Sequence, residues 1–171
     1  KLAKENINSL NYNFITPYFI SPHDNKTLYH GGNYVMKTTN QGNSWSQISP
    51  DLSKSKNSFS AGAIAESPLQ KGLLYYGSDK GSFWVSKDDG KSWNENSKNI
   101  KDNYIRSIYP SKFLKSRVYM AMTGINYDDL GNYIYMSENY GKDWKTIKSN
   151  FPNEPANVII EDLKYENILY A

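Results

Sequence analysis

The sequence predicts an all-β protein built from repeated four-stranded sheets, and three observations support this prediction. Of the 171 residues, 15% are aromatic, including 15 tyrosines, and this composition favours strands over helices. Glycine, asparagine and serine interrupt the chain at short intervals, as is typical of many short strands joined by turns. A polar turn that ends on tryptophan occurs three times, with the tryptophans 48 and 51 residues apart. Recurrence at this distance indicates a repeat array.

Each repeat begins with the same succession of short apolar runs and turns. In the first repeat, residues 14–20 form an apolar run interrupted by Pro17, and residues 34–38 form a later run that enters the polar turn. In every repeat a tyrosine follows a serine or aspartate by eight residues, at Ser21 and Tyr29, Ser67 and Tyr75, Ser111 and Tyr119, and Asp162 and Tyr170. Short apolar runs bounded by turn residues predict strands.

The later repeats place their apolar runs at matching positions. First runs lie at residues 61–65, 105–109 and 158–160, second runs at 73–77, 117–121 and 168–171, and third runs at 83–86 and 133–137. With the short segment after each tryptophan, a complete repeat holds four strands. A period of about 45–50 residues is that of β-propeller blades.

The repeats predict about three and a half blades of a propeller ring that this chain does not close. We expect blades at about residues 14–49, 61–97 and 104–148, and the start of a fourth at about 157–171. A four-stranded blade needs a neighbour on each face to bury its apolar side chains. Because the last apolar run stops in mid-strand and would expose an edge, we expect the remaining blades to come from the same protein or another chain.

The recurrent polar turn is expected to be structural. In its second copy, Asp88 can accept backbone N–H bonds within the turn, Gly90 supplies a left-handed conformation, and Trp93 returns into the blade to bury its ring. Asn40 and Asn139 replace the aspartate and can form the same bonds without charge. The residues that define the three turns are Thr38, Asn40, Gly42 and Trp45, then Ser86, Asp88, Gly90 and Trp93, then Ser137, Asn139, Gly141 and Trp144.

Composition excludes several classes of partner and site. The formal charge of +3 arises from 20 basic and 17 acidic residues spread along the chain, whereas nucleic-acid binding usually shows as a clustered basic face. Without cysteine, disulfides and thiolate–metal sites are excluded. No apolar run approaches the roughly 20 residues of a membrane span, and residues 1–13 do not resemble a signal peptide.

The three turns resemble the Asp-box of BNR-repeat β-propellers. That superfamily includes sialidases, xyloglucan-degrading glycosidases, sortilin-type sorting receptors and a photosystem II assembly factor. The Ser-Pro and Leu-Tyr segments before the first two turns are most similar to sortilin-like bacterial propellers often labelled glycosyl hydrolases. The resemblance implies a secreted protein, extracellular or periplasmic. Asn40, Asn139 and Asp143 depart from the box pattern, and the lack of cysteine removes any resemblance to the cysteine-rich part of sortilins.

Catalysis has few candidate residues in this chain. As the resemblance implies, a sialidase holds the substrate carboxylate with three arginines, but Arg106 and Arg117 are the only two here. The chain alone is therefore not expected to be a sialidase. Other glycoside hydrolases need two carboxyl groups about 5–5.5 Å or 6.5–9.5 Å apart. Asp79, Asp128 and Asp129 are candidates, from loops expected on the ligand face, although such acids are usually solvated turn residues.

Other residues are candidates for contact with a bound ligand. Arg106 is expected either to contact an anionic ligand or to form a structural ion pair. Tyr127 could stack on a sugar together with Trp84, although the position of Trp84 on a strand favours packing within the blade. Glu66 and Glu161 end first strands, where they can line a central channel or pair between blades.

No metal ion or cofactor is expected. His23 and His30 are the only histidines and no cysteine can complete a zinc set, while one carboxylate per turn falls short of the six or more oxygens that calcium prefers. No phosphate-binding loop or nucleophile elbow occurs. The leading hypothesis is a binding or scaffolding module for a protein, peptide or carbohydrate ligand. The alternative is part of a secreted glycoside hydrolase whose active site is completed by residues outside this chain.

Overall fold

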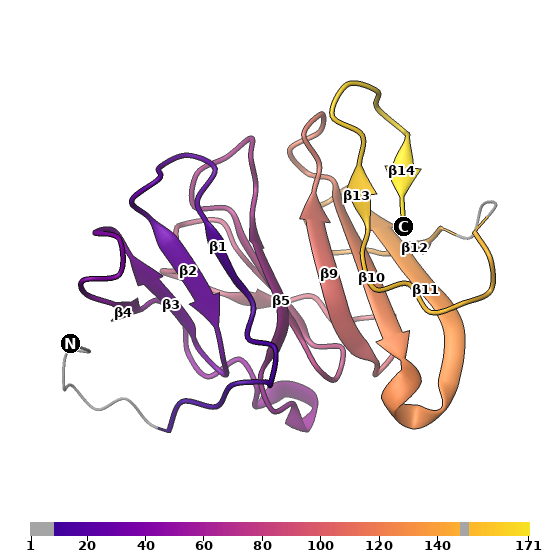
Figure 1. Ribbon diagram of the computed structural model, residues 1–171, viewed down its shortest axis with the longest axis horizontal. Helices are drawn as coiled ribbons and strands as arrows, with labels where there is room; N and C mark the ends of the chain where they lie inside the picture. The colour runs from indigo at the N-terminus through magenta and orange to yellow at the C-terminus, as the bar shows by residue number, and fades with distance from the viewer. Residues whose placement is uncertain (1–8, 148–150) are drawn as a thin grey trace.

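The computed structural model describes residues 9–147 and 151–171, and these fold almost entirely into antiparallel strands (Figure 1). Sheet 1 contains β1 (Tyr18–Ile20), β2 (Leu28–Gly31), β3 (Val35–Thr38) and β4 (Ser46–Gln47). Sheet 2 contains β5 (Ala61–Glu66), β6 (Leu74–Ser78), β7 (Phe83–Ser86) and β8 (Asn94–Glu95). Sheet 3 contains β9 (Tyr104–Pro110), β10 (Val118–Gly124), β11 (Asp129–Ser137) and β12 (Lys145–Thr146). Sheet 4 contains β13 (Ile160–Glu161) and β14 (Leu169–Tyr170).

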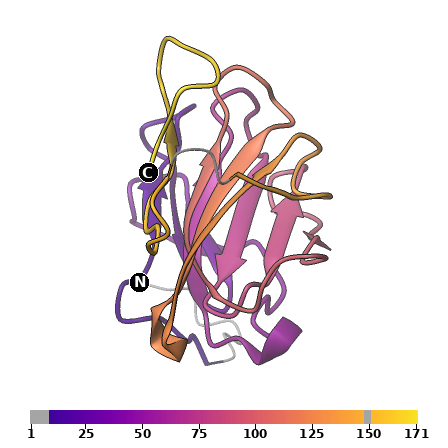
Figure 2. The same cartoon turned by 90° about the vertical axis from the view of Figure 1, so that its right-hand side faces the viewer.

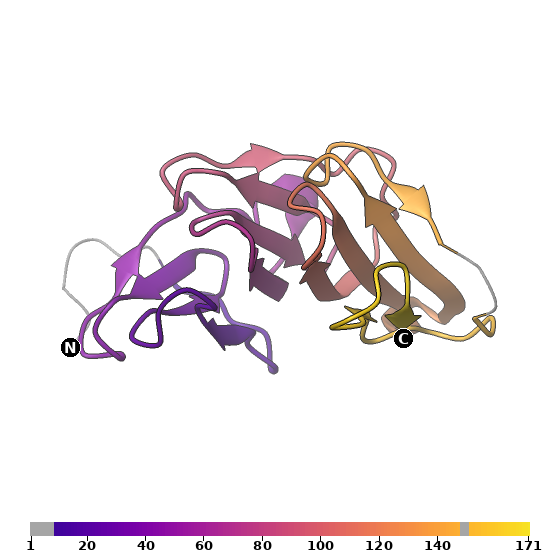
Figure 3. The ribbon, with the colours of Figure 1, turned by 90° about the horizontal axis from the view of Figure 1, so that it is seen from above.

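The sheets follow one another around an open arc. Within each sheet the strands pair in chain order, and the first strands β1, β5 and β9 lie on the concave side of the arc in the view from above (Figure 3). The outer strands β8 and β12 lie on its convex side. This arrangement confirms the prediction of an all-β propeller segment in which these sheets do not close a ring.

Antiparallel pairing sorts the connections to two ends of the molecule. Turns between first and second strands share one end with the polar turns between third and fourth strands, which we call the box end. The loops between second and third strands and the links between sheets share the opposite end, the loop end. The short 3₁₀ helices η1 (Ser55–Asn57) and η2 (Ile125–Tyr127) both lie at the loop end (Figures 1 and 2). No helix in the described parts of the chain is long and apolar enough to cross a bilayer.

The core lies between the sheets. The three tyrosines of the eight-residue spacing in sheets 1 to 3 are each 1% exposed, at Tyr29, Tyr75 and Tyr119. Burial of an aromatic side chain of this size stabilises the fold by about 1.5–3 kcal/mol. The first strands must approach closely, because a Cβ at Gly62 in β5 would lie 2.3 Å from the carbonyl oxygen of Ile105 in β9. Only glycine fits this contact.

The polar turns are tied together by their own side chains. In the second turn, the Ser86 hydroxyl accepts a bond from the Gly90 N–H at 2.9 Å, and Asp88 accepts one from the Ser92 N–H at 2.9 Å. The residue before each glycine has a positive φ, of 58° at Gln41, 62° at Asp89 and 64° at Tyr140. Asn40 and Asn139 accept the bonds equivalent to those of Asp88, from Ser44 at 2.9 Å and Asp143 at 2.8 Å.

The tryptophan of the second turn contacts a neighbouring sheet as well as its own. The sequence alone places Trp93 in its own blade, whereas the structure shows its indole N–H donating to the Ile48 carbonyl of sheet 1 at 2.9 Å. Trp93 also packs against the apolar cluster shared by sheets 1 and 2. The second turn therefore helps to hold sheets 1 and 2 together.

Two buried glutamates join consecutive sheets. Glu66 of sheet 2 accepts a bond from the Ser21 hydroxyl of sheet 1 at 2.6 Å. Glu161 of sheet 4 accepts bonds from two hydroxyls of sheet 3, Ser111 at 2.8 Å and Tyr119 at 2.9 Å. With exposed fractions of 5% and 1%, both glutamates pair between sheets, one of the two alternatives that the sequence leaves open.

The junction between sheets 2 and 3 lacks this glutamate. Pro110 ends β9 at the position that Glu66 and Glu161 hold in their own strands. Each of these three residues pairs with the residue that directly precedes the tyrosine of the eight-residue spacing. The buried Tyr75 hydroxyl, which corresponds to that of Tyr119, has no hydrogen-bond partner among the described residues. The sheets are thus joined differently at this junction.

Candidate functional site

The loop end presents two groups of polar residues, and Asp79 belongs to the first. It lies partly buried after β6, and its carboxylate accepts a bond from the Phe59 N–H at 3.0 Å. The Asp79 N–H donates to the Ser60 carbonyl at 3.1 Å. Two bonds to the incoming link between sheets 1 and 2 therefore fix this aspartate.

Tyr104 and Arg106 of β9 complete this first group. The guanidinium carbon of Arg106 lies 5.1 Å from the centre of the Tyr104 ring, a cation–π distance. Burial raises the pKa of Tyr104, the charge of Arg106 opposes that rise, and the charge of Asp79 adds to it. Both charges therefore act on one phenol. Arg106 forms no ion pair with any residue that the structure describes.

The second group contains Lys101, Asp129 and Tyr133. The Lys101 ammonium lies 2.6 Å from an Asp129 carboxylate oxygen, and the Tyr133 hydroxyl donates to Asp129 at 2.8 Å. Lys101 also contacts the Tyr133 hydroxyl. These two donors, with the Gly131 N–H, hold the pKa of Asp129 well below its ordinary value, and Asp129 in turn raises the pKa of Lys101.

The remaining candidates of the long loop point to solvent. Tyr127 is 54% exposed at the end of η2. Asp128 follows it with a φ of 56° and an exposed side chain. Trp84 packs against the apolar cluster between sheets 1 and 2, so it belongs to the blade packing.

Of the candidate acids, Asp129 alone forms an ion pair within the part of the chain that the structure describes. Asp79 shares a neighbour with Arg106, and Asp129 is bound by Lys101. The ion pair with Lys101 favours the ionised form of Asp129, whereas a general acid must carry a proton for the leaving group. The arrangement is suited to holding a polar or charged ligand.

Sequence reasoning missed Lys101, Tyr104 and Tyr133. Lys101 lies in the link between sheets 2 and 3, Tyr104 begins β9, and Tyr133 lies within β11. Their neighbours are distant in sequence, since Lys101 and Asp129 are 28 residues apart. The one available signal was charge, because Lys101 and Asp129 both flank predicted strands at the loop end.

Neither histidine joins a metal-ligand group. The His23 ring contacts the Ser67 carbonyl at 2.8 Å, and His30 packs edge-on against Trp45. Within residues 9–147 and 151–171, no three His, Asp or Glu side chains converge as metal ligands would. Burial lowers the pKa of His30, consistent with a packing role.

Solved structures share this fold. An ancestral GH74 enzyme is similar over 96% of this chain and 22% of its own, with a TM-score of 0.74 at 17% identity. The GH74 xyloglucanase from Xanthomonas campestris is similar over 78% of this chain and 22% of its own, with a TM-score of 0.59 at 16% identity. The structure of YCF48 bound to D1 peptide is similar over 84% of this chain and 41% of its own, with a TM-score of 0.52 at 20% identity. At these identities the similarity establishes the β-propeller fold alone.

Family membership comes from the sequence itself. Comparison with curated proteins found no match. The chain spans about a fifth of the length of these two GH74 structures, 22% of each. The family model described as "Sortilin, neurotensin receptor 3" matches residues 81–170, just over half of the chain. The chain therefore belongs to the Sortilin-Vps10 family.

Proposed function

We propose that this chain is a binding and scaffolding segment of a propeller, which recognises a protein, peptide or carbohydrate ligand at its loop end and concave side. One observation carries the proposal: Arg106 lies on the innermost strand of sheet 3, beside Tyr104, without an ion-pair partner among the described residues. A guanidinium presents a fixed fork of donors that matches a carboxylate. A ligand with a carboxylate suits this position, and exposed Tyr127 offers an aromatic contact on the same end of the molecule.

Similar proteins support a binding role. The family description names a receptor, and one structure of the same fold holds a peptide. Both statements concern those proteins, and they make peptide recognition a reasonable first test for this chain. The same resemblance supports the proposal that the protein is secreted and works outside the cell or in the periplasm.

Scaffolding is proposed from the two ends of the arc. In β1, Phe19 packs toward sheet 2, while Tyr18 and Ile20 are 78% and 60% exposed on the opposite face. In sheet 4, Ile160 pairs with Tyr170, and they are 42% and 52% exposed. Exposed apolar faces of this kind mark interaction surfaces. We propose that further blades, of this protein or another chain, cover both, with the blades of this chain at about residues 14–49, 61–97, 104–148 and 157–171.

A glycoside hydrolase is the alternative. It is favoured by the structural similarity to GH74 enzymes, and it requires a second carboxyl group from outside the chain to face Asp79 or Asp128. The ion pair of Asp129 with Lys101 argues against a general-acid role for Asp129.

Peptide binding and hydrolysis can be tested with separate variants of the loop end. Peptides with free and with amidated C-termini would be measured against the wild type, Arg106→Gln, and Lys80→Gln as a control cation at the loop end. Loss of one carboxylate–guanidinium pair predicts weaker binding of the free-acid peptides by about tenfold or more in Arg106→Gln. Equal binding by Arg106→Gln and the wild type would contradict the proposal. Xyloglucan cleavage that disappears in Asp79→Asn would favour the hydrolase instead.

A further inference from the structure

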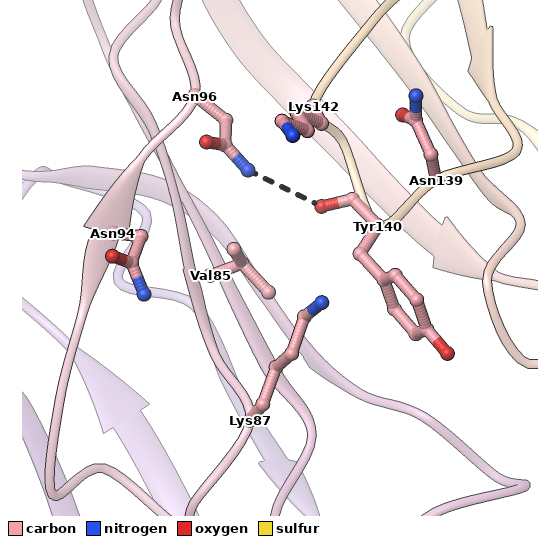
Figure 4. A pocket seen from close by; sticks show the side chains of 7 residues that line it. All are labelled: Val85, Lys87, Asn94, Asn96, Asn139, Tyr140 and Lys142. Carbon is pink, nitrogen blue, oxygen red and sulfur yellow. Dashed lines mark hydrogen bonds between the residues drawn. The ribbon is translucent and has the colours of Figure 1, made fainter.

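A pocket lies between sheets 2 and 3 at the box end, away from the loop end. It has a volume of about 260 Å³. Sheet 2 and its turn contribute Val85, Lys87, Asn94 and Asn96, and the third polar turn contributes Asn139, Tyr140 and Lys142. Figure 4 shows Lys87 extending toward Tyr140, and the amide of Asn96 directed at the Tyr140 carbonyl. This volume is just below that of drug-sized sites, so it suits one small chemical group.

The equivalent junction between sheets 1 and 2 is closed by an ion pair. There Asp89, the residue before the turn glycine, accepts bonds from the Lys37 ammonium at 2.6 and 2.8 Å. Trp93 closes the same junction through its bond to Ile48.

Between sheets 2 and 3, different residues occupy these positions. By alignment of the turns, Tyr140 replaces Asp89, Val85 replaces Lys37, and Asn96 replaces Ile48. The Trp144 indole N–H, which corresponds to that of Trp93, is buried without a hydrogen-bond partner among the described residues. The junction has therefore lost both contacts that close its counterpart.

The two lysines of the pocket lack an acidic partner. The Lys87 ammonium lies 3.7 Å from the centre of the Tyr140 ring, where its positive charge is only partly compensated. In the described parts of the chain, neither Lys87 nor Lys142 forms an ion pair. Among the described residues that line the pocket, none carries a carboxylate. The site therefore favours an anion.

Side-chain amides complete the lining. Asn96 donates to the Tyr140 carbonyl at the long distance of 3.5 Å, and the amide of Asn94 has no bond to a described residue. Carboxamides can both donate to and accept from hydroxyl groups, whereas ammonium groups pair with carboxylates. A uronic acid carries hydroxyls and a carboxylate on one ring. We propose that this pocket binds a uronic acid residue of an acidic polysaccharide, a role independent of the function proposed for the loop end.

Lysine variants that copy the first repeat test the site without disturbing the fold. Lys87→Thr and Lys142→Asn introduce the residues that the first turn carries at these positions, Thr39 and Asn43. Calorimetric titration of the 171-residue chain with trigalacturonate should show binding that the double variant weakens by about tenfold or more. Tyr140→Asp, which copies Asp89, should weaken it similarly by supplying Lys87 with an internal carboxylate.

Lys91→Asn is the matched control, because Lys91 follows the glycine of the second turn as Lys142 follows that of the third. This control should bind trigalacturonate like the wild type, and neutral maltotriose should not bind. Absence of trigalacturonate binding, or an equal loss in Lys91→Asn, would overturn the proposal. Triglutamate bound as tightly as trigalacturonate would overturn the assignment to a sugar, since it would show a site for carboxylates in general.

Discussion

Single hydroxyl groups distinguish the junctions between sheets. Tyr119 donates to buried Glu161 at 2.9 Å, whereas the equivalent Tyr75 hydroxyl is buried without a partner among the described residues. A buried polar atom costs free energy when it is unpaired and stabilises the fold modestly when it is paired. Two tyrosines of equal burial therefore contribute differently.

Removing these two hydroxyls should affect the free energy of unfolding differently. Tyr119→Phe should lower the free energy of unfolding by about 1–3 kcal/mol, because it removes a donor from Glu161. Tyr75→Phe should leave it unchanged or raise it slightly, because no bond is lost. Urea denaturation of both variants measures the difference. Equal destabilisation by the two substitutions would contradict the assigned bonding.

The aspartate of the second turn should make stability depend on pH. Hydrogen bonds from the hydroxyl and N–H of Ser92, and from Ser86, hold the pKa of Asp88 below its ordinary value. Its stabilising contribution is therefore complete above the ordinary pKa of about 3.9 and is lost as the pH falls through the lower pKa of the folded state. Asp88→Asn, which copies Asn40 and Asn139, should show a smaller loss of stability in acid. Denaturation curves with the same acid dependence as the wild type would exclude this role.

At the scale of elements, the polar turns contact the neighbouring sheet, and the residues that make these contacts differ from junction to junction. Asp89 and Trp93 bind sheet 2 to sheet 1 through Lys37 and Ile48. Tyr140 leaves the next junction open as a pocket. The same backbone turn therefore closes one junction and borders a pocket at the next, according to the residues that face one another across the junction.

Local patterns predicted the strands, but contacts between sheets required the structure. The eight-residue spacing and the tryptophan turns identified the strands and the propeller fold, because both reflect neighbours in sequence. The Lys101–Asp129 ion pair and the Trp93–Ile48 bond join residues 28 and 45 positions apart. Such pairs depend on how consecutive sheets stack, which no local pattern encodes. For the same reason Asp129 could be named from the sequence as a candidate, whereas its basic partner Lys101 could not.

At the scale of the whole molecule, the two end faces of the arc determine whether the chain associates with other chains. Apolar side chains are exposed on β1 and on sheet 4, including Ile20 at 60% and Ile160 at 42%. Without covering blades, such faces should associate to remove apolar surface from water. The scaffolding role thus predicts a concentration-dependent assembly of the isolated chain.

Multi-angle light scattering of the isolated chain tests this role most directly. We predict a mass that rises above the 19.6 kDa of the monomer as concentration increases. The double variant Ile20→Lys and Ile160→Lys should remain monomeric. Leu69→Lys, which removes an exposed apolar side chain from the turn after β5, should associate like the wild type. A wild-type chain that stays at 19.6 kDa at every concentration would contradict the existence of two open docking faces.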